Sequence, residues 1–230
     1  MDKEISQDGR ENSRAGKIFA VGDIHGRFDK LSRLLERLPY EPRRDTLVFL
    51  GDYIDRGPDS FKVVDCICRL QEKGRQVIAL LGNHEHLLLE YHRTADHNVL
   101  ALLRRLQIET TMKAYGRDSL SDLRSLAFLP AAHRHFFENL RLYWETEKFI
   151  FVHAGLLPGV SPAQQGVESL TGIRDLFLET EQGFGKQVVF GHTPFETPLV
   201  TPAKIGIDTG AAYGGQLTAL ELPTLCFHHA

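Results

Sequence analysis

The chain is poor in the features that define several large classes of protein. Its 230 residues contain only three cysteines, two methionines and one tryptophan. The cysteines are Cys66, Cys68 and Cys226, and their odd number and irregular spacing argue against a disulfide framework. We expect them to be small buried residues of a protein in a reducing cytosol.

Long apolar runs and an excess of one charge are also missing. No stretch approaches the roughly 18 apolar residues of a membrane span. Residues 1–16 are polar and lack the apolar segment of a signal peptide, so we expect a mobile tail. The net charge is only −3, which gives no electrostatic basis for binding nucleic acid. These absences predict a cytoplasmic protein with neither a membrane nor a nucleic acid as partner.

Regular alternation of apolar patterns is present instead. Apolar runs at 17–21, 46–50 and 77–81 predict buried strands, and helical spacing at 28–38 and 58–73 predicts the helices between them. Strands joined by helices over short connections favour a parallel sheet. We therefore expect an α/β fold that begins with this sheet.

The rest of the chain has a different pattern. Residues 85–140 are rich in helical spacing and hold no chemical motif, so we expect a helical cap at about 86–140. Later strands are expected at 140–144, 149–153, 188–190, 199–200, 205–207 and 217–222, with a helix near 168–180. Such short strands predict an antiparallel or mixed sheet, and we expect one domain over 17–230.

Polar side chains follow most of these strands directly. Asp23 and His25 follow the first strand, Asp52 the second, and Asn83 the third. His153 and His192 follow two later strands in the same way. Open α/β sheets bind their ligands at the carboxyl ends of strands, and Asp, His and Asn are ligands for divalent metals. Each residue alone could be a solvated turn or a structural histidine, but together they predict a metal site.

The order and spacing of these residues resemble a known family. The sequence reads GDIHG at 22–26, GDYIDRG at 51–57, GNHE at 82–85, HAG at 153–155 and GHTP at 191–194. This pattern is similar to that of the phosphoprotein phosphatase family of metallophosphoesterases, in its bacterial and phage branch of Ser/Thr protein phosphatases. The resemblance implies a calcineurin-like metallophosphoesterase fold, with two mixed β-sheets sandwiched between helical layers and a single catalytic domain over 17–230.

The resemblance also implies a centre of two divalent metal ions. Its metal ligands would be Asp23 and His25 for the first ion, Asp52 as the bridge, and Asn83, His153 and His192 for the second. Oxygen and imidazole ligands without thiolate suit manganese, iron or zinc, and we expect Mn²⁺ from the family.

The implied reaction is direct attack on phosphorus by a hydroxide that bridges the metals, with no phosphoenzyme. His84 is then the expected general acid, and Asp55 holds its imidazole in the right tautomer. Arg56 is expected to bind two phosphoryl oxygens, for which a planar guanidinium is well shaped.

Three further residues are expected to contact the substrate. The Asn83 amide can donate to a phosphoryl oxygen. Arg174 is the expected second arginine, although a surface salt-bridge residue is the alternative. Tyr213 resembles a tyrosine of a family loop near the site, although a surface turn residue fits its sequence equally.

The motifs define the reaction better than the substrate. We expect a protein Ser/Thr phosphatase, with phosphotyrosine also possible, that acts on a phosphorylated protein or a small phosphoester. The alternative enzyme is a symmetrical dinucleoside-tetraphosphate hydrolase. An inactive phosphate-binding scaffold is the alternative outside enzymes, and the complete set of ligand residues argues against it.

Overall fold

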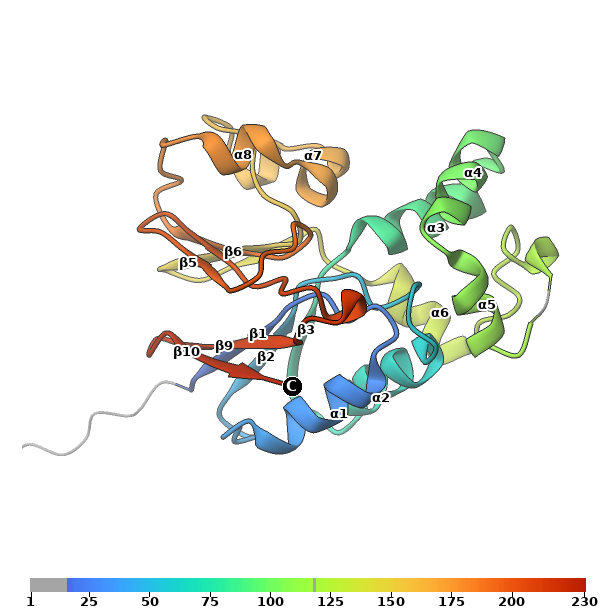
Figure 1. Cartoon of the computed structure of the whole chain (residues 1–230), viewed down its shortest axis with the longest axis horizontal. Helices are drawn as coiled ribbons and strands as arrows, with labels where there is room; N and C mark the ends of the chain where they lie inside the picture. The colour runs from blue at the N-terminus through green and yellow to red at the C-terminus, as the bar shows by residue number, and fades with distance from the viewer. Residues whose placement is uncertain (1–15, 118) are drawn as a thin grey trace, which may run out of the picture.

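The fold is built around two mixed β-sheets (Figure 1). The computed structural model describes residues 16–117 and 119–230. The tail expected at 1–16 therefore lies outside the described residues, apart from Gly16. The predicted α/β class with two mixed sheets is confirmed.

The first sheet has the strand order β10-β9-β1-β2-β3. Strands β1 (Ile18–Val21), β2 (Thr46–Phe49) and β3 (Gln76–Ala79) are parallel, as the short connections through α1 (Phe28–Arg37) and α2 (Ser60–Glu72) predict. Strand β9 (Thr218–Leu222) adds antiparallel to β1, and β10 (Cys226–His229) pairs antiparallel with β9 at the edge. The sheet thus joins the beginning and the end of the chain.

The second sheet has the order β4-β5-β6-β8-β7. Strands β5 (Phe149–Val152), β6 (Gln187–Phe190) and β8 (Lys204–Gly206) are parallel, whereas β4 (Tyr143–Glu145) and β7 (Leu199–Val200) are antiparallel to their neighbours. The expected hairpin of β4 and β5 and the mixed character of this half are therefore present.

Alternating side chains place apolar residues on both faces of each sheet. In β1, Phe19 and Val21 pack in the cluster that includes α1 and α2, whereas Ala20 points to a second cluster shared by both sheets. In β6, Val189 joins that same inter-sheet cluster, and Val188 and Phe190 pack in a third cluster with helical residues. The layers are thus helix, sheet, sheet and helix, as Figure 1 shows.

Two short helices cover the outer face of the second sheet, where the sequence predicted one helix at 168–180. The chain forms α7 (Val167–Gly172) and α8 (Asp175–Glu179) instead. Arg174 between them has φ −132° and ψ −97°, outside the helical region, so the single helix is wrong. The break places Arg174 at the start of a helix instead of within one.

The middle segment is helical, as expected. It contains α3 (Asn83–Thr94), α4 (His97–Arg105), α5 (Ile108–Ala114) and α6 (Ala131–Glu138), which stand beside the sheets in Figure 1. No helix within the described ranges is long and apolar enough to cross a membrane. Short 3₁₀ turns complete the described elements at Leu120–Asp122, Pro162–Gln164 and Ala211–Tyr213.

The three thiols are free, but they differ in environment. Cys68 is buried and Cys66 is half-buried, both in α2. Cys226 is exposed on the edge strand β10, so the expectation that all three cysteines are buried is wrong for this residue.

Candidate metal centre and active site

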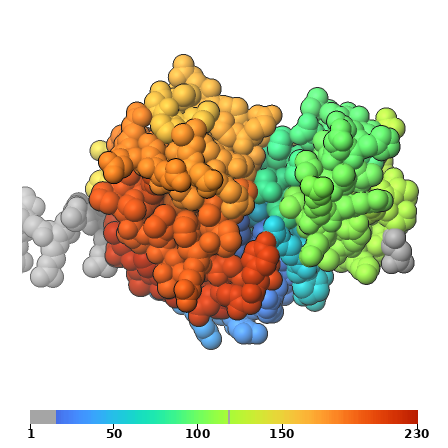
Figure 2. All heavy atoms as spheres, turned by 45° about the horizontal axis from the view of Figure 1, so that its top comes forward, coloured from blue at the N-terminus to red at the C-terminus, as the bar shows by residue number. Residues whose placement is uncertain are grey.

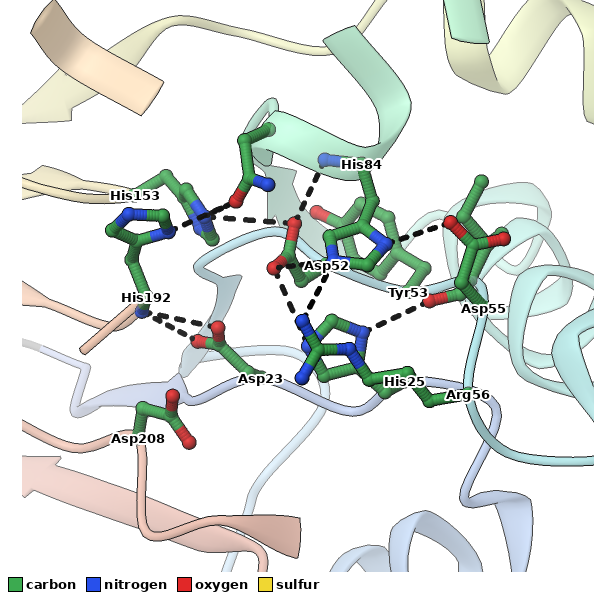
Figure 3. A network of polar contacts seen from close by, with 12 residues as sticks. Asp23, His25, Asp52, Tyr53, Asp55, Arg56, His84, His153, His192 and Asp208 are labelled. Carbon is green, nitrogen blue, oxygen red and sulfur yellow. Dashed lines mark hydrogen bonds and ion pairs between the residues drawn. The ribbon is translucent and has the colours of Figure 1, made fainter. Parts of the chain in front are cut away.

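The predicted metal ligands lie at the carboxyl ends of parallel strands from both sheets. Asp23, Asp52 and Asn83 follow β1, β2 and β3, each after a glycine. From the second sheet, His153 and His192 follow β5 and β6, and Figure 3 shows them facing the residues of the first sheet. Parallel strands present their carboxyl ends at one edge, which explains why residues so distant in sequence meet.

Backbone strain is concentrated at this site. Several of its residues adopt positive φ angles although they are not glycine: His25 (47°), Asp52 (53°), Asp55 (68°), Arg56 (65°) and His192 (63°). Such conformations each cost free energy and tend to cluster at functional sites. The strain therefore supports a functional role for the loops after β1, β2 and β6.

Two motif glycines make room for carboxylates. A Cβ atom at Gly82 would lie 2.2 Å from Asp52 Oδ1, and one at Gly191 would lie 2.1 Å from Asp23 Oδ1. Atoms cannot approach so closely, so any larger residue would displace the carboxylate. The glycines before Asn83 and His192 are thus explained by the packing of the acids beside them.

Asp52 stands at the centre of the cluster, and its two oxygens face different groups. Oδ2 lies 3.4 Å from His25 Nε2, whereas Oδ1 lies 3.5 Å from His153 Nε2. Asn83 Oδ1 lies 3.1 Å from that same His153 Nε2 and 2.9 Å from His192 Nδ1. Donor atoms about 2.0–2.2 Å from a common ion lie roughly 3 Å from one another. The arrangement therefore fits two adjacent cations bridged by Asp52.

Hydrogen bonds fix two of these imidazoles in the tautomer that a cation needs. His25 Nδ1 donates to the Ile54 carbonyl oxygen at 2.9 Å, and His153 Nδ1 donates to the Leu50 carbonyl oxygen at 2.9 Å. In each ring Nε2 then carries the lone pair that faces Asp52. His192 Nε2, by contrast, is buried and has no hydrogen-bond partner among the described residues.

Burial keeps these histidines neutral. It lowers the pKa of His25 and of His192 to about 3, and it also lowers the pKa of His153. Burial alone would raise the pKa of Asp52, but the surrounding histidines, His153 first, hold it far below its usual value. At neutral pH the cluster consequently offers a carboxylate and free imidazole lone pairs, the forms that ligate metals.

Asp23 adds a second carboxylate, and its oxygens accept hydrogen bonds from the His192 backbone N–H at 3.1 and 3.0 Å. Burial raises the pKa of Asp23 well above its usual value, and the neighbouring carboxylates of Asp208 and Asp52 raise it further. Buried acids that repel one another are stabilised by a cation between them. The residues present therefore fit a centre of divalent ions.

A second network surrounds His84. Its Nδ1 lies 2.7 Å from Asp55 Oδ2, and Arg56 Nη2 lies 3.2 Å from its Nε2. Burial lowers the pKa of His84, but the carboxylates of Asp52 and Asp55 outweigh burial and raise it above its usual value. With the Nδ1 proton held by Asp55, Nε2 is the nitrogen that can gain or lose a proton, and in this structure it accepts a hydrogen bond from Arg56.

The helical middle segment contributes to this network, although the sequence shows no motif there. The Thr111 hydroxyl in α5 donates to Asp55 Oδ1 at 2.6 Å and accepts the Asp55 backbone N–H at 2.8 Å. Ser60 Oγ lies 3.2 Å from the same hydroxyl. The segment at 86–140 therefore fixes Asp55, which in turn orients His84.

Glu85 has a structural part in the site. Its carboxylate accepts backbone N–H bonds from Asp52 (3.0 Å), Tyr53 (2.8 Å) and Ile54 (3.2 Å). Burial, followed by the charge of Asp52, raises the pKa of Glu85 to about 8. The last residue of GNHE thus fixes the loop that carries Asp52 and Asp55.

The site opens into a pocket of about 210 Å³. Arg56, Arg174 and Tyr213 line it, so the structure brings all the predicted substrate-contacting residues to one place. The Arg56 guanidinium lies 4.7 Å from the centre of the Tyr213 ring, and Arg174 Nη1 donates to Thr193 Oγ1 at 3.3 Å. Figure 2 shows this side of the molecule hollowed between the helices of the middle segment and the second half.

Three lining residues were given no role from the sequence, namely Leu106, Pro194 and Asp208. Leu106 ends α4 and carries no chemical signal. Asp208 directly follows the apolar run of β8, in the same way that Asp23 and Asp52 follow their strands, so its position was a usable signal.

The fold and the cluster together define a class of protein. A model of the calcineurin-like phosphoesterase family matches residues 16–219, and the chain belongs to this family. The resemblance seen in the motifs is thereby confirmed, and the chain is a phosphoester hydrolase by family.

Individual relatives differ in their named substrates. The bis(5′-nucleosyl)-tetraphosphatase PrpE [asymmetrical] of Halalkalibacterium halodurans is 28% identical over 236 residues, covering 90% of each chain. Serine/threonine-protein phosphatase 1 of Salmonella typhimurium is 30% identical over 215 residues, covering 89% of this chain and 91% of its own. A crystal structure described as a candidate diadenosine tetraphosphatase superposes with a TM-score of 0.71 at 24% identity, over 95% of this chain and 94% of its own. That likeness supports the fold alone.

Proposed function

We propose that the chain is a metal-dependent dinucleoside-tetraphosphate hydrolase. The observation that carries the hydrolytic part is the placement of Asp52, whose two oxygens face two separate groups of ligand atoms. The substrate is supported by the relative from H. halodurans, which matches this chain over nearly its whole length. The function expected from the sequence, a protein Ser/Thr phosphatase, becomes the second candidate.

Two divalent ions would be held by Asp23, His25 and Asp52 on one side and by Asp52, Asn83, His153 and His192 on the other. Such ions supply Lewis acidity to the phosphoryl oxygens and lower the pKa of water. A donor set of oxygen and imidazole without thiolate suits manganese, iron or zinc. Among these we propose Mn²⁺, as the family resemblance implies.

The chain's own residues would then act on a bridging P–O–P bond. Water adds its oxygen to one phosphorus and releases a proton, which restores that of His84 through solvent, and the P–O bond on its far side breaks. His84 donates its Nε2 proton to the departing oxygen, while Asp55 keeps the imidazole oriented through Nδ1. Proton donation matters because a polyphosphate oxygen would otherwise leave with an added negative charge.

The two arginines would bind the phosphate chain. Arg56 and Arg174 line the same pocket, and their guanidinium groups suit bidentate contacts with phosphoryl oxygens. Tyr213 is 63% exposed, so its ring is available to a substrate as well as to Arg56. The helices at 86–140 would form the cap on this pocket, and the free thiols fit the reducing cytoplasm.

Product analysis tests this proposal. The purified chain is incubated with Mn²⁺ and diadenosine tetraphosphate, and the nucleotides are separated by anion-exchange chromatography. We expect AMP and ATP, the asymmetrical pattern of the relative from H. halodurans, and two ADP molecules would indicate the symmetrical mode. The His84→Asn variant is the matched control and should release little of either.

The second candidate is favoured by the Salmonella relative, which is named a serine/threonine-protein phosphatase and aligns over 89% of this chain. Phosphoserine and phosphothreonine peptides belong in the same assay. A kcat/KM for a phosphopeptide at least about tenfold above that for diadenosine tetraphosphate, or about 1.4 kcal/mol, would favour this candidate. If no phosphoester is hydrolysed with any divalent ion, only the hypothesis of an inactive phosphate-binding scaffold remains.

A further inference from the structure

Asp208 is a buried acid that the motif pattern does not use. It follows β8 and is only 5% exposed, yet it lines the same pocket as His25, Asp52 and His192. Its Oδ1 accepts the Gly210 backbone N–H at 2.9 Å. Within the described part of the chain, this is the one hydrogen bond of its carboxylate, so Oδ2 is available to accept a hydrogen bond from a bound group.

Asp208 lies among acids, and the guanidinium groups of Arg56 and Arg174 line the same pocket. Figure 3 shows its carboxylate on the same side of the cluster as Asp23, and Asp52 lies beyond. Two carboxylates of this group are almost fully buried with Asp208, namely Asp23 (3%) and Asp52 (2%). An acid buried beside two others is costly unless a positive charge lies close to it.

The two ion positions of the proposed centre differ in their number of protein ligands. The second position has four protein ligands, Asp52, Asn83, His153 and His192. The first position has three, Asp23, His25 and Asp52, and it lies on the side where Asp208 stands. Divalent hard cations take six oxygen or nitrogen ligands, so the first ion would keep several water molecules.

The turn that carries Asp208 is held from outside the site. Lys30 Nζ donates to the carbonyl oxygens of Ala211 (2.8 Å) and Gly215, and Arg27 Nη1 donates to Ala211 O at 3.1 Å. Lys30 is itself buried, at 9% exposure. Two cations of α1 and its preceding loop thus fix the segment after β8, which keeps Asp208 from turning out to solvent.

We propose that Asp208 is a positioning residue of the first ion, which its free carboxylate oxygen holds through a coordinated water molecule. The proposal rests on the ion centre of the proposed function and assigns it an additional acidic group. Asp208 touches the ion's water shell and supplies negative charge, and it binds no ion directly. Removal of its charge should weaken the first ion and leave the second ion in place.

Metal binding without substrate tests the proposal. Mn²⁺ is titrated into metal-free wild type, Asp208→Asn and Asp45→Asn, and binding is followed by calorimetry and by the loss of the free Mn²⁺ paramagnetic resonance signal. Asparagine keeps an acceptor for Gly210 and removes only the charge. Loss of a group that holds a ligand typically weakens metal binding about 10- to 100-fold, and we expect that change for one of two ions.

Asp45 is the matched control because it too is buried (4%) and accepts backbone N–H groups, from Lys17 and Glu41. Its substitution should leave both Mn²⁺ affinities unchanged. Two unchanged affinities in Asp208→Asn would overturn the role of Asp208. A wild type that binds no Mn²⁺ would instead overturn the proposed function itself.

Thermal unfolding separates this role from a purely structural one. In EDTA, Asp208→Asn should unfold at a higher temperature than wild type, because one of three mutually repelling carboxylates is gone. With Mn²⁺ the rise in melting temperature should be smaller than that of wild type. A variant that melts lower in EDTA and gains as much from Mn²⁺ as wild type would show that Asp208 only shapes the turn.

Discussion

Nδ1 of His84 lies 2.7 Å from Oδ2 of Asp55, and both side chains are completely buried. Asp55 is held in turn by Thr111 from α5, which lies in a segment without any recognisable motif. A buried carboxylate placed in this way orients the ring and favours its protonated form. The pair therefore has the arrangement expected of a general acid and the residue that keeps it ready.

Loss of the acid should slow turnover without loss of metal. We expect His84→Asn to bind the same number of ions as wild type, because His84 contacts Asp55 and is not one of the proposed metal ligands. Turnover should fall about 10²- to 10⁴-fold, the usual contribution of general acid catalysis. The loss should be larger for phenyl phosphate than for p-nitrophenyl phosphate, whose leaving group needs less protonation. Equal losses for both esters would contradict the acid role.

The pH profile should report on the same pair. The Asp52 and Asp55 carboxylates raise the pKa of His84 above its usual value, so its proton is retained until the pH exceeds that raised pKa. In Asp55→Asn one of these charges is lost and the pKa of His84 falls. The alkaline limb of kcat should consequently move to lower pH, measured between pH 6 and 10 at saturating substrate and Mn²⁺. Thr111→Ser keeps the hydroxyl and should keep the wild-type profile, whereas an unmoved limb in Asp55→Asn would contradict the assignment.

Added metal should stabilise the fold through Asp52. At a free Mn²⁺ concentration 100 times the dissociation constant, one bound ion adds about 2.7 kcal/mol to the free energy of unfolding. For a domain of this length, that corresponds to a rise in melting temperature of about 5–10 °C. Asp52→Asn should lose most of this rise and at least one ion by elemental analysis. A full complement of ions in this variant would rule out the bridging role.

Substitution of Gly191 tests whether Asp23 needs the space that this glycine leaves. A Cβ at Gly191 would meet Asp23 Oδ1 at 2.1 Å, so Gly191→Ala should displace Asp23 and lower the stability by about 1–3 kcal/mol, measured by denaturant unfolding. Mn²⁺ affinity should fall with it. Gly172→Ala is the matched control, because no described atom beyond its chain neighbours and its own helix backbone lies within 4 Å of the added Cβ. Wild-type stability and metal binding in Gly191→Ala would show that Asp23 has room to move.

Much of this architecture could be predicted from short-range patterns. Apolar runs of three to five residues define β1, β2, β3, β5 and β6, and a polar residue follows each run, after a glycine in every case except β5. The fold class and the mixed sheets follow from those runs because parallel strands need helical crossovers. Convergence of the site residues then follows from the sheet edge.

Other features depend on contacts that no local pattern encodes. Thr111 reaches Asp55 from 56 residues away, and nothing distinguishes it from Thr110 in sequence. The break at Arg174 within an otherwise helical run depends on the backbone angles of one residue. Asp208 differs again. The sequence shows that it follows a strand, but only the structure shows that it lines the pocket beside the proposed metal ligands.

The cluster is split between the two sheets. Residues before about 140 supply Asp23, His25, Asp52 and Asn83, whereas His153 and His192 come from the later half. Neither portion carries a full set of donors for the second cation, and β9 must return to β1 to close the first sheet. Complementary fragments cut in the connection between α6 and β4 should therefore reassociate more tightly when manganese is present, which would make the ion a clasp between two pieces of polypeptide.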